Sequence, residues 1–172
     1  MKLFLMTLLA LLTVLPSEVW AQAKPDLSGA WTFDEAKSDP APARAGGGGG
    51  GGGGRGGGRG GAPATAMTIK QTAADLSIER TLPQGAQTAV YKLDGTESTN
   101  TIGMGPATSK ASWDGARLVI TTTQTMQGRG GGGEVTIESK DIYARDGDTL
   151  TIETTRTTPN GSTSRKLVYT KN

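Results

Sequence analysis

The side chains that could do chemistry in this sequence are carboxylates and arginines, because the 172-residue chain contains no histidine and no cysteine. Their absence excludes Ser-His-Asp and Cys-His nucleophilic catalysis. It also removes the usual ligands of zinc, haem and iron–sulfur centres. The sequence therefore predicts no catalytic residue, no cofactor and no metal site, and we expect the protein not to be an enzyme. An enzyme that uses neither histidine nor cysteine is kept as the third alternative below.

Some acidic residues lie where the chain is expected to turn. Asp146 and Asp148 flank Gly147, and Asp114 precedes Gly115. This spacing fits no calcium-binding loop, whereas aspartate before glycine is typical of a tight turn. Other charged residues lie within expected strands, where cross-strand pairing is the commoner role. We expect such pairs among Glu79, Arg80, Glu138, Lys140, Asp141, Glu153 and Arg156.

Four arginines lie in or beside glycine runs. Arg44, Arg55 and Arg59 belong to the stretch RAGGGGGGGGGRGGGRGGA (44–62), and Arg129 to QGRGGGGE (127–134). Without them and the first 23 residues, the chain is slightly acidic. RNA-binding Arg-Gly segments use many repeats with interspersed aromatics, which are absent here, so we expect no RNA partner and interpret the stretch as a linker. Contact of these four arginines with an anionic polymer is the alternative.

The first residues have the pattern of a secretory signal peptide. Met1-Lys2 precedes a mostly apolar run (3–15), then Pro16 and the small residues Ala21 and Ala23. We expect a signal over 1–23, cleaved after Ala21 or Ala23, and export to the periplasm or the exterior. The run is too short to span a bilayer. The mature chain then has one domain: a first strand and turn (24–43), the glycine-rich loop (44–62) and the remaining strands (63–172). We expect a monomer.

Alternating apolar and polar residues, bounded by turn signals, predict an all-β domain. Asp114-Gly115, Asp146-Gly147 and Asn160-Gly161 favour hairpins between successive strands. A single antiparallel up-and-down barrel follows, because closure removes exposed sheet edges; a two-sheet sandwich is the alternative. The expected strands are 29–34, 66–72, 75–82, 86–93, 107–113, 117–127, 134–144, 149–157 and 162–171.

Three stretches resemble a family of bacterial exported, lipocalin-like proteins of largely unknown function. They are PDLSGAWTFDEAKSD (25–39), ASWDGARLVITTT (111–123) and DGDTLTIETTRTTPNGSTSRKLVYTK (146–171). The resemblance implies a lipocalin-like barrel in which Gly29 and Trp31 close the base and Arg165 or Lys166 covers the tryptophan. It also implies that the glycine-rich insert is dispensable to the fold.

The expected core contains Trp31 and Trp113, both buried near strand ends, and medium to large inward side chains that leave little room for a ligand. Three functions remain open. The first is a non-enzymatic exported barrel that is structural or binds a small apolar ligand. The second is a surface interaction protein that holds anionic polymer through its arginine-glycine loops. The third is an enzyme for which no residues can be named.

Overall fold

The alternating pattern produces ten β-strands in a computed structural model that describes residues 23–40, 63–83, 85–103, 105–127 and 133–172. Large side chains alternate with small or polar ones along each strand, so one face is buried and the other solvated. The elements are β1 (Gly29–Phe33), η1 (Glu35–Lys37), β2 (Ala66–Gln71), β3 (Asp75–Leu82), β4 (Gly85–Lys92), β5 (Glu97–Ile102), β6 (Gly105–Asp114), β7 (Arg117–Gln127), β8 (Glu134–Asp146), β9 (Thr149–Thr158) and β10 (Gly161–Lys171).

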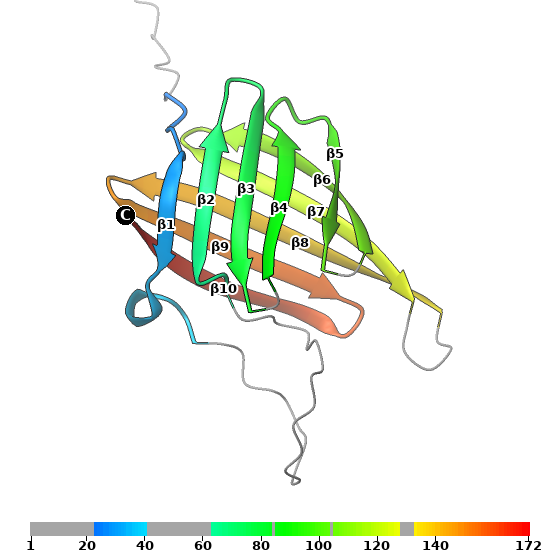
Figure 1. Cartoon of the computed structure of the whole chain (residues 1–172). Helices are drawn as coiled ribbons and strands as arrows, with labels where there is room; N and C mark the ends of the chain where they lie inside the picture. The colour runs from blue at the N-terminus through cyan, green and yellow to red at the C-terminus, as the bar shows by residue number, and fades with distance from the viewer. Residues whose placement is uncertain (1–22, 41–62, 84, 104, 128–132) are drawn as a thin grey trace, which may run out of the picture.

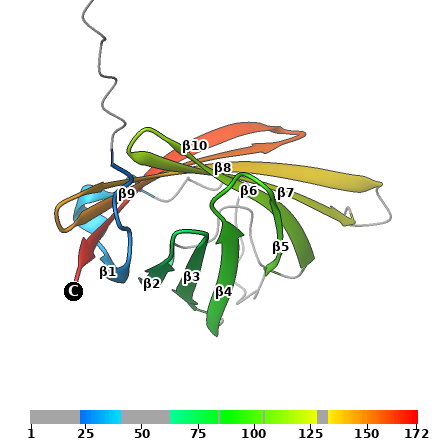
Figure 2. The same cartoon turned by 90° about the horizontal axis from the view of Figure 1, so that it is seen from above.

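All ten strands belong to one antiparallel sheet in the order β4-β3-β2-β1-β10-β9-β8-β7-β6-β5. The first and last strands pair, with Trp31 opposite Lys171. Figures 1 and 2 show β1–β5 as one layer and β6–β10 as the other, with the strands of the two layers crossing at a large angle. The nearly closed up-and-down barrel is thus confirmed, and the sandwich alternative is wrong.

The strand bounds agree with the expected ranges to within two residues, and one strand was missed. β5 reads ESTNTI, in which Ile102 is the only large apolar residue. A polar strand leaves no alternating apolar signal in the sequence. It forms here because its neighbour β6 supplies a ladder from Glu97↔Lys110 to Ile102↔Gly105.

The three expected hairpins are present, with one difference in their backbone. Gly115, Gly147 and Gly161 have φ angles of 61°, 55° and 125°. Among the described residues no other type has positive φ, so Asp114, Asp146 and Asn160 do not share the left-handed conformation. The glycine alone therefore provides the unusual angle at each turn.

The apolar core fills the end of the barrel where β1 begins and β10 ends, called here the closed end. Trp31, Leu76, Leu118 and Leu150 have no exposed surface there. Burying a side chain of this kind contributes roughly 1.5–3 kcal/mol. The main buried members are Leu27, Trp31, Ile69, Leu76, Ile78, Leu93, Leu118, Ile120, Leu150 and Ile152.

The barrel closes between β4 and β5 through side chains. In the described part of the chain these two strands share no backbone ladder, yet they lie side by side. The Asn100 amide accepts a hydrogen bond from Val90 N at 2.8 Å and donates one to Val90 O at 2.9 Å. Lys92 N donates to Ser98 Oγ at 2.9 Å, and Gln87 Nε2 donates to Thr101 O at 2.9 Å. We call this contact the amide seam.

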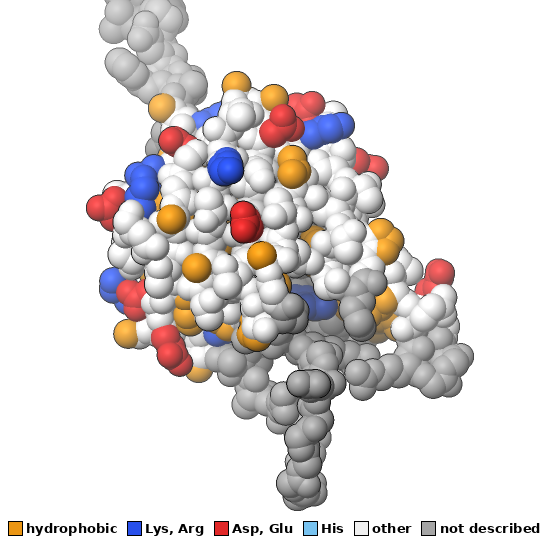
Figure 3. All heavy atoms as spheres, in the orientation of Figure 1, with side chains coloured by type: hydrophobic (Ala, Val, Ile, Leu, Met, Phe, Trp, Pro, Cys, Tyr) orange, Lys and Arg blue, Asp and Glu red, His pale blue; other side chains and the backbone are white. Residues whose placement is uncertain are grey.

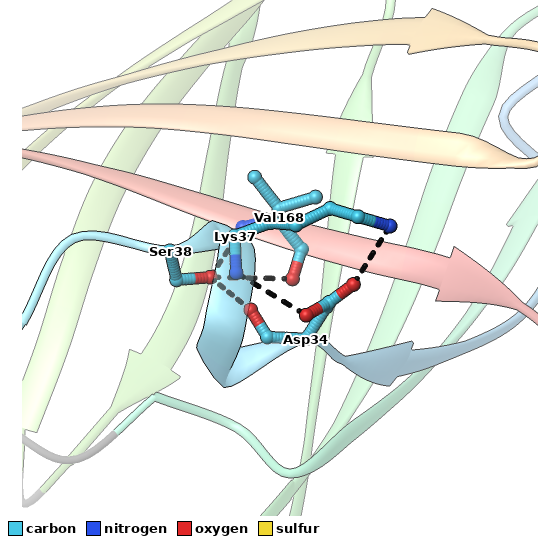
Figure 4. A network of polar contacts seen from close by, with 4 residues as sticks. All are labelled: Asp34, Lys37, Ser38 and Val168. Carbon is cyan, nitrogen blue, oxygen red and sulfur yellow. Dashed lines mark hydrogen bonds and ion pairs between the residues drawn. The ribbon is translucent and has the colours of Figure 1, made fainter.

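A short segment after β1 covers the outer side of β10 (Figure 4). Val168 N donates to Ser38 Oγ at 2.8 Å, and Lys37 N donates to Asp34 Oδ1 at 3.2 Å. Lys37 Nζ also pairs with Asp34 Oδ2 at 3.0 Å. This cover explains why Val168, on the outward side of its strand, is buried. The same contacts fix the direction in which the chain leaves β1.

Candidate functional site

The chemically richest place in the described structure is a group of polar side chains inside the barrel. Strand alternation turns Arg80 inward on β3, after buried Leu76 and Ile78. It does the same for Asp141 on β8, two residues before buried Tyr143. Arg156 follows buried Ile152 by four residues on β9 and therefore shares its face. We call Arg80, Tyr91, Asp141, Tyr143 and Arg156 the inner polar cluster.

Arg80 and Tyr143 join the two layers of the barrel. Arg80 Nη2 donates to Tyr143 Oη at 2.7 Å. Burial alone would lower the pKa of the Arg80 guanidinium, but Tyr143, Tyr91 and Asp141 outweigh it, so that pKa is raised. Burial also raises the pKa of Tyr143, while Arg80 opposes this effect. Arg80 is therefore a permanent cation and Tyr143 a neutral hydroxyl at physiological pH.

Arg156 supplies a second guanidinium, and one of its hydrogen-bond donors is unpaired among the described residues. Its Nε is buried and has no hydrogen-bond partner in the described structure. The ion pairs among the described residues join Lys37 to Asp34, Lys110 to Glu97 and Arg117 to Asp114. None of them involves Arg80 or Arg156. A buried donor without an acceptor is costly, and such groups usually meet water or a ligand.

Asp141 is the inward-facing carboxyl group of β8, close to Arg156 in the register of β8 with β9. It lies opposite Thr154 on β9, one inward position from Arg156. Burial raises the pKa of Asp141, whereas the Thr154 hydrogen bond, Arg80 and Arg156 lower it, and burial dominates. No ion pair within 4.0 Å joins Asp141 to either arginine in the described chain. The expected cross-strand ion pairs of Arg80, Asp141 and Arg156 are thus wrong for the described residues. All three side chains face the interior, where Arg80 bonds to the Tyr143 hydroxyl in place of a carboxylate.

The sequence did contain a signal for this cluster. Arg80, Asp141 and Arg156 each have the same parity as the apolar residues that face inward on their strands: Ile78, Tyr143 and Ile152. Parity predicts the facing of a side chain. It does not predict which inward residues of β3, β8 and β9 meet across the barrel, because that depends on how the two layers cross.

Trp31 lies at the closed end, where the resemblance implied a covered tryptophan. Its Nε1 donates to Leu27 O at 3.0 Å. The cations over its ring are Arg145, at 5.7 Å, and Lys171, at 5.8 Å. Arg165 instead donates from Nε to Asp39 O at 3.1 Å, and Lys166 pairs its backbone with Asp39. The basic cover of Trp31 therefore comes from Lys171 and the end of β8, and the assignment to Arg165 or Lys166 is wrong.

Two other expected structural residues lie nearby. Gly29 has a φ of 146°. A Cβ at this position would lie 2.8 Å from Lys171 Cε, so the absence of a side chain at Gly29 lets the Lys171 side chain pass over β1. Trp113 is only partly buried, packed against the edge of the core. The expectation that Trp113 is buried near a strand end is correct for its position at the end of β6 and wrong for its burial, because it borders an open depression.

Two depressions of the described surface lie outside the barrel, at its closed end. The larger, about 470 Å³, is bordered by Trp113, Gln71 and Lys24; the second, about 430 Å³, by Lys24, Lys92 and Asp94. Figure 3 shows charged and apolar side chains scattered singly over the face of β1–β5. Within the described ranges, no group of three metal-ligating residues occurs. No helix there is long and apolar enough to cross a membrane.

The four arginines considered for polymer contact, Arg44, Arg55, Arg59 and Arg129, lie outside the described residues. The flanking strand ends, β1 and β2 for the first three and β7 and β8 for the last, belong to the same end of the barrel. We expect deletion of 46–61 to leave the melting temperature nearly unchanged, because loop closure costs only about 0.6 kcal/mol per doubling of length.

The same deletion should reduce salt-sensitive retention on heparin if these arginines bind anionic polymer. Thermal unfolding and heparin elution of one deletion variant measure both effects. Unchanged retention would remove the polymer hypothesis, and a variant that cannot fold would contradict the linker interpretation.

Comparison with known proteins finds distant structural similarity only. No family model and no curated protein sequence matches the chain. Zebrafish ileal bile acid-binding protein, complexed with cholic acid, has a TM-score of 0.47 at 17% identity, covering 62% of this chain and 72% of that one. The Manduca sexta fatty-acid-binding protein has a TM-score of 0.43 at 22% identity, covering 61% and 71%.

A secretory abundant heat soluble protein from Ramazzottius varieornatus has a TM-score of 0.46 at 18% identity, covering 62% of this chain and 70% of that one. These are likenesses to β-barrel proteins at low identity. Membership of the bacterial exported family stays a prediction.

Proposed function

We propose that the protein is a non-enzymatic barrel that binds a small amphipathic anion in its interior. The observation that supports this most directly is the buried Arg156 Nε, which has no partner among the described residues. Arg80, the second inward guanidinium, is bonded there to a neutral hydroxyl and to no carboxylate. An anionic group placed between them would supply the missing acceptors, and charge-assisted bonds of this kind are the strong ones.

The surroundings suit a ligand with an apolar part. Phe33, Leu82 and Leu167 are partly buried and pack against the core. Leu82 is the last residue of β3, so it lies nearer than Arg80 does to the end of the barrel opposite Trp31. A ligand with its charged group at the arginines would therefore extend its apolar part toward this end. The closed end is already filled by Trp31 and its neighbours.

Export of the mature protein is part of the same proposal and rests on the signal-like residues 1–23. Intact mass of the mature protein from the producing cells tests it: a start at Gln22 or Lys24 supports export, and retention of Met1 with the apolar run contradicts it.

Calorimetry with decanoate and decan-1-ol tests the ligand proposal, because the two probes differ in charge and share their chain length. Decanoate should bind to the parent more tightly than decan-1-ol. Arg156→Met keeps the aliphatic volume and removes the donors, so it should weaken decanoate binding about tenfold or more and leave decan-1-ol binding unchanged. Arg117→Met, which removes an exposed pair with Asp114, is the matched control and should change neither.

Two results would contradict the proposal. Equal decanoate affinities of the parent and Arg156→Met would remove the arginine from the site. Failure of both probes to bind the parent would mean that inward side chains fill the barrel, as their sizes in the sequence predict.

A further inference from the structure

The position of Asp141 makes it a rival of any anion that binds Arg80 and Arg156. On β8 it faces the interior between Ser139 and Tyr143. Thr154 is directly opposite on β9, and Arg156 is the diagonal neighbour on the same face. Diagonal neighbours in a sheet are within reach of long side chains. Arg80 arrives from the other layer, fixed by its 2.7 Å bond to Tyr143.

We infer that Asp141 is a built-in competitor of the ligand, so that anion binding is coupled to proton uptake by this carboxyl group. The inference rests on the proposed function. An ionised Asp141 partly neutralises the two arginines and repels an incoming anion. A protonated Asp141 does neither and can donate a hydrogen bond. The carboxyl group thus sets how strongly the two cations attract a ligand.

Burial favours the neutral form of Asp141, so this carboxyl group takes up a proton more readily than an exposed aspartate does. Its pKa in the free protein is already raised, first by desolvation. A bound anion would raise that pKa further, because like charges in one site disfavour each other's ionisation. Binding is then strongest below the pKa of the free protein. It weakens as pH rises toward the pKa of the complex.

The other groups around Asp141 do not titrate in the same range. The basic groups that face it are Arg80 on β3, Arg156 on β9 and Arg165 on β10, and the arginine side chain is not deprotonated in proteins. The tyrosines close by are Tyr91 on β4, Tyr143 on β8 and Tyr169 on β10, and burial raises the pKa of Tyr143. Burial raises the pKa of Tyr169 to about 12. On β7 the residue opposite Asp141 is apolar Ile120. A pH dependence of binding over the range tested below therefore reports on Asp141.

Binding of decane-1-sulfonate from about pH 5 to about pH 9 tests the coupling, because a sulfonate does not change its own charge there. For the parent we expect affinity to fall with rising pH, by up to about tenfold per pH unit. Calorimetry in two buffers with different ionisation enthalpies should show uptake of up to one proton. Asp141→Asn should bind with a pH-independent affinity that exceeds the parent's about tenfold at the upper end.

Asp148→Asn is the matched control, since Asp148 is exposed in the turn between β8 and β9 at the closed end. It should keep the parent's pH dependence. Constant affinity and no proton uptake in the parent would overturn the inference while leaving the binding function intact, and this measurement needs no variant. A pH dependence that persists in Asp141→Asn would also overturn it. Absence of sulfonate binding at every pH would refute the proposed function itself, and the inference with it.

Discussion

Replacement of Trp31 by alanine is expected to lower the free energy of unfolding by about 3–5 kcal/mol. Trp31 has no exposed surface and lies among the apolar residues of the closed end. Its removal leaves a cavity that the surrounding strands cannot fill without moving. The change also deletes the bond to Leu27 O and the ring beneath Arg145 and Lys171. Urea unfolding measures the loss.

Trp113→Ala is the matched control for this experiment, because it removes the same side chain from a partly exposed position. Its cost should be smaller, about 1–2 kcal/mol, in proportion to the apolar area lost. If the two variants unfold at the same urea concentration, Trp31 does not have the central place in the core that its burial indicates.

Asn100→Ala is expected to open the amide seam and to cost about 1–3 kcal/mol, because each of two hydrogen bonds contributes roughly 0.5–1.5 kcal/mol. Asn100 accepts from Val90 N and donates to Val90 O, so one side chain replaces the backbone of a missing strand partner. Removing it should also accelerate hydrogen exchange of the Val90 amide, which then depends on water alone.

Two further variants distinguish the loss of the two Asn100 hydrogen bonds from a general effect of substitution in β5. Asn100→Asp keeps an acceptor for Val90 N and loses the donor to Val90 O, so we expect an intermediate stability. Thr99→Ala changes the neighbouring exposed position on β5 and should leave both stability and Val90 exchange unchanged. Full protection of the Val90 amide in Asn100→Ala would show that the seam is held by something else.

The amide seam illustrates why β5 was not predicted. Sequence patterns find a strand through the apolar residues it buries, and β5 buries Ser98 in place of an apolar side chain. Its place depends on β6 on one side and on side-chain amides facing β4 on the other. Both contacts join residues that no local pattern connects. The same limit explains the partly buried Trp113, whose type predicts burial and whose exposure depends on the open depression beside it.

The sequence by itself determined the all-β class, the hairpin connections and most strand bounds, because these follow from local alternation and from glycines that take positive φ. The parity of Arg80, Asp141 and Arg156 also matches that of the core residues of their strands, although only cross-strand pairs are predicted from it. Only the tertiary structure decided that they belong to one cluster and that Lys171 and Arg145, not Arg165, cover Trp31. These side-chain contacts depend on the register of β1 with β10 and on the angle at which the two layers cross. Long-range closure of a barrel is a property of the whole sheet, so no segment of the chain encodes it alone.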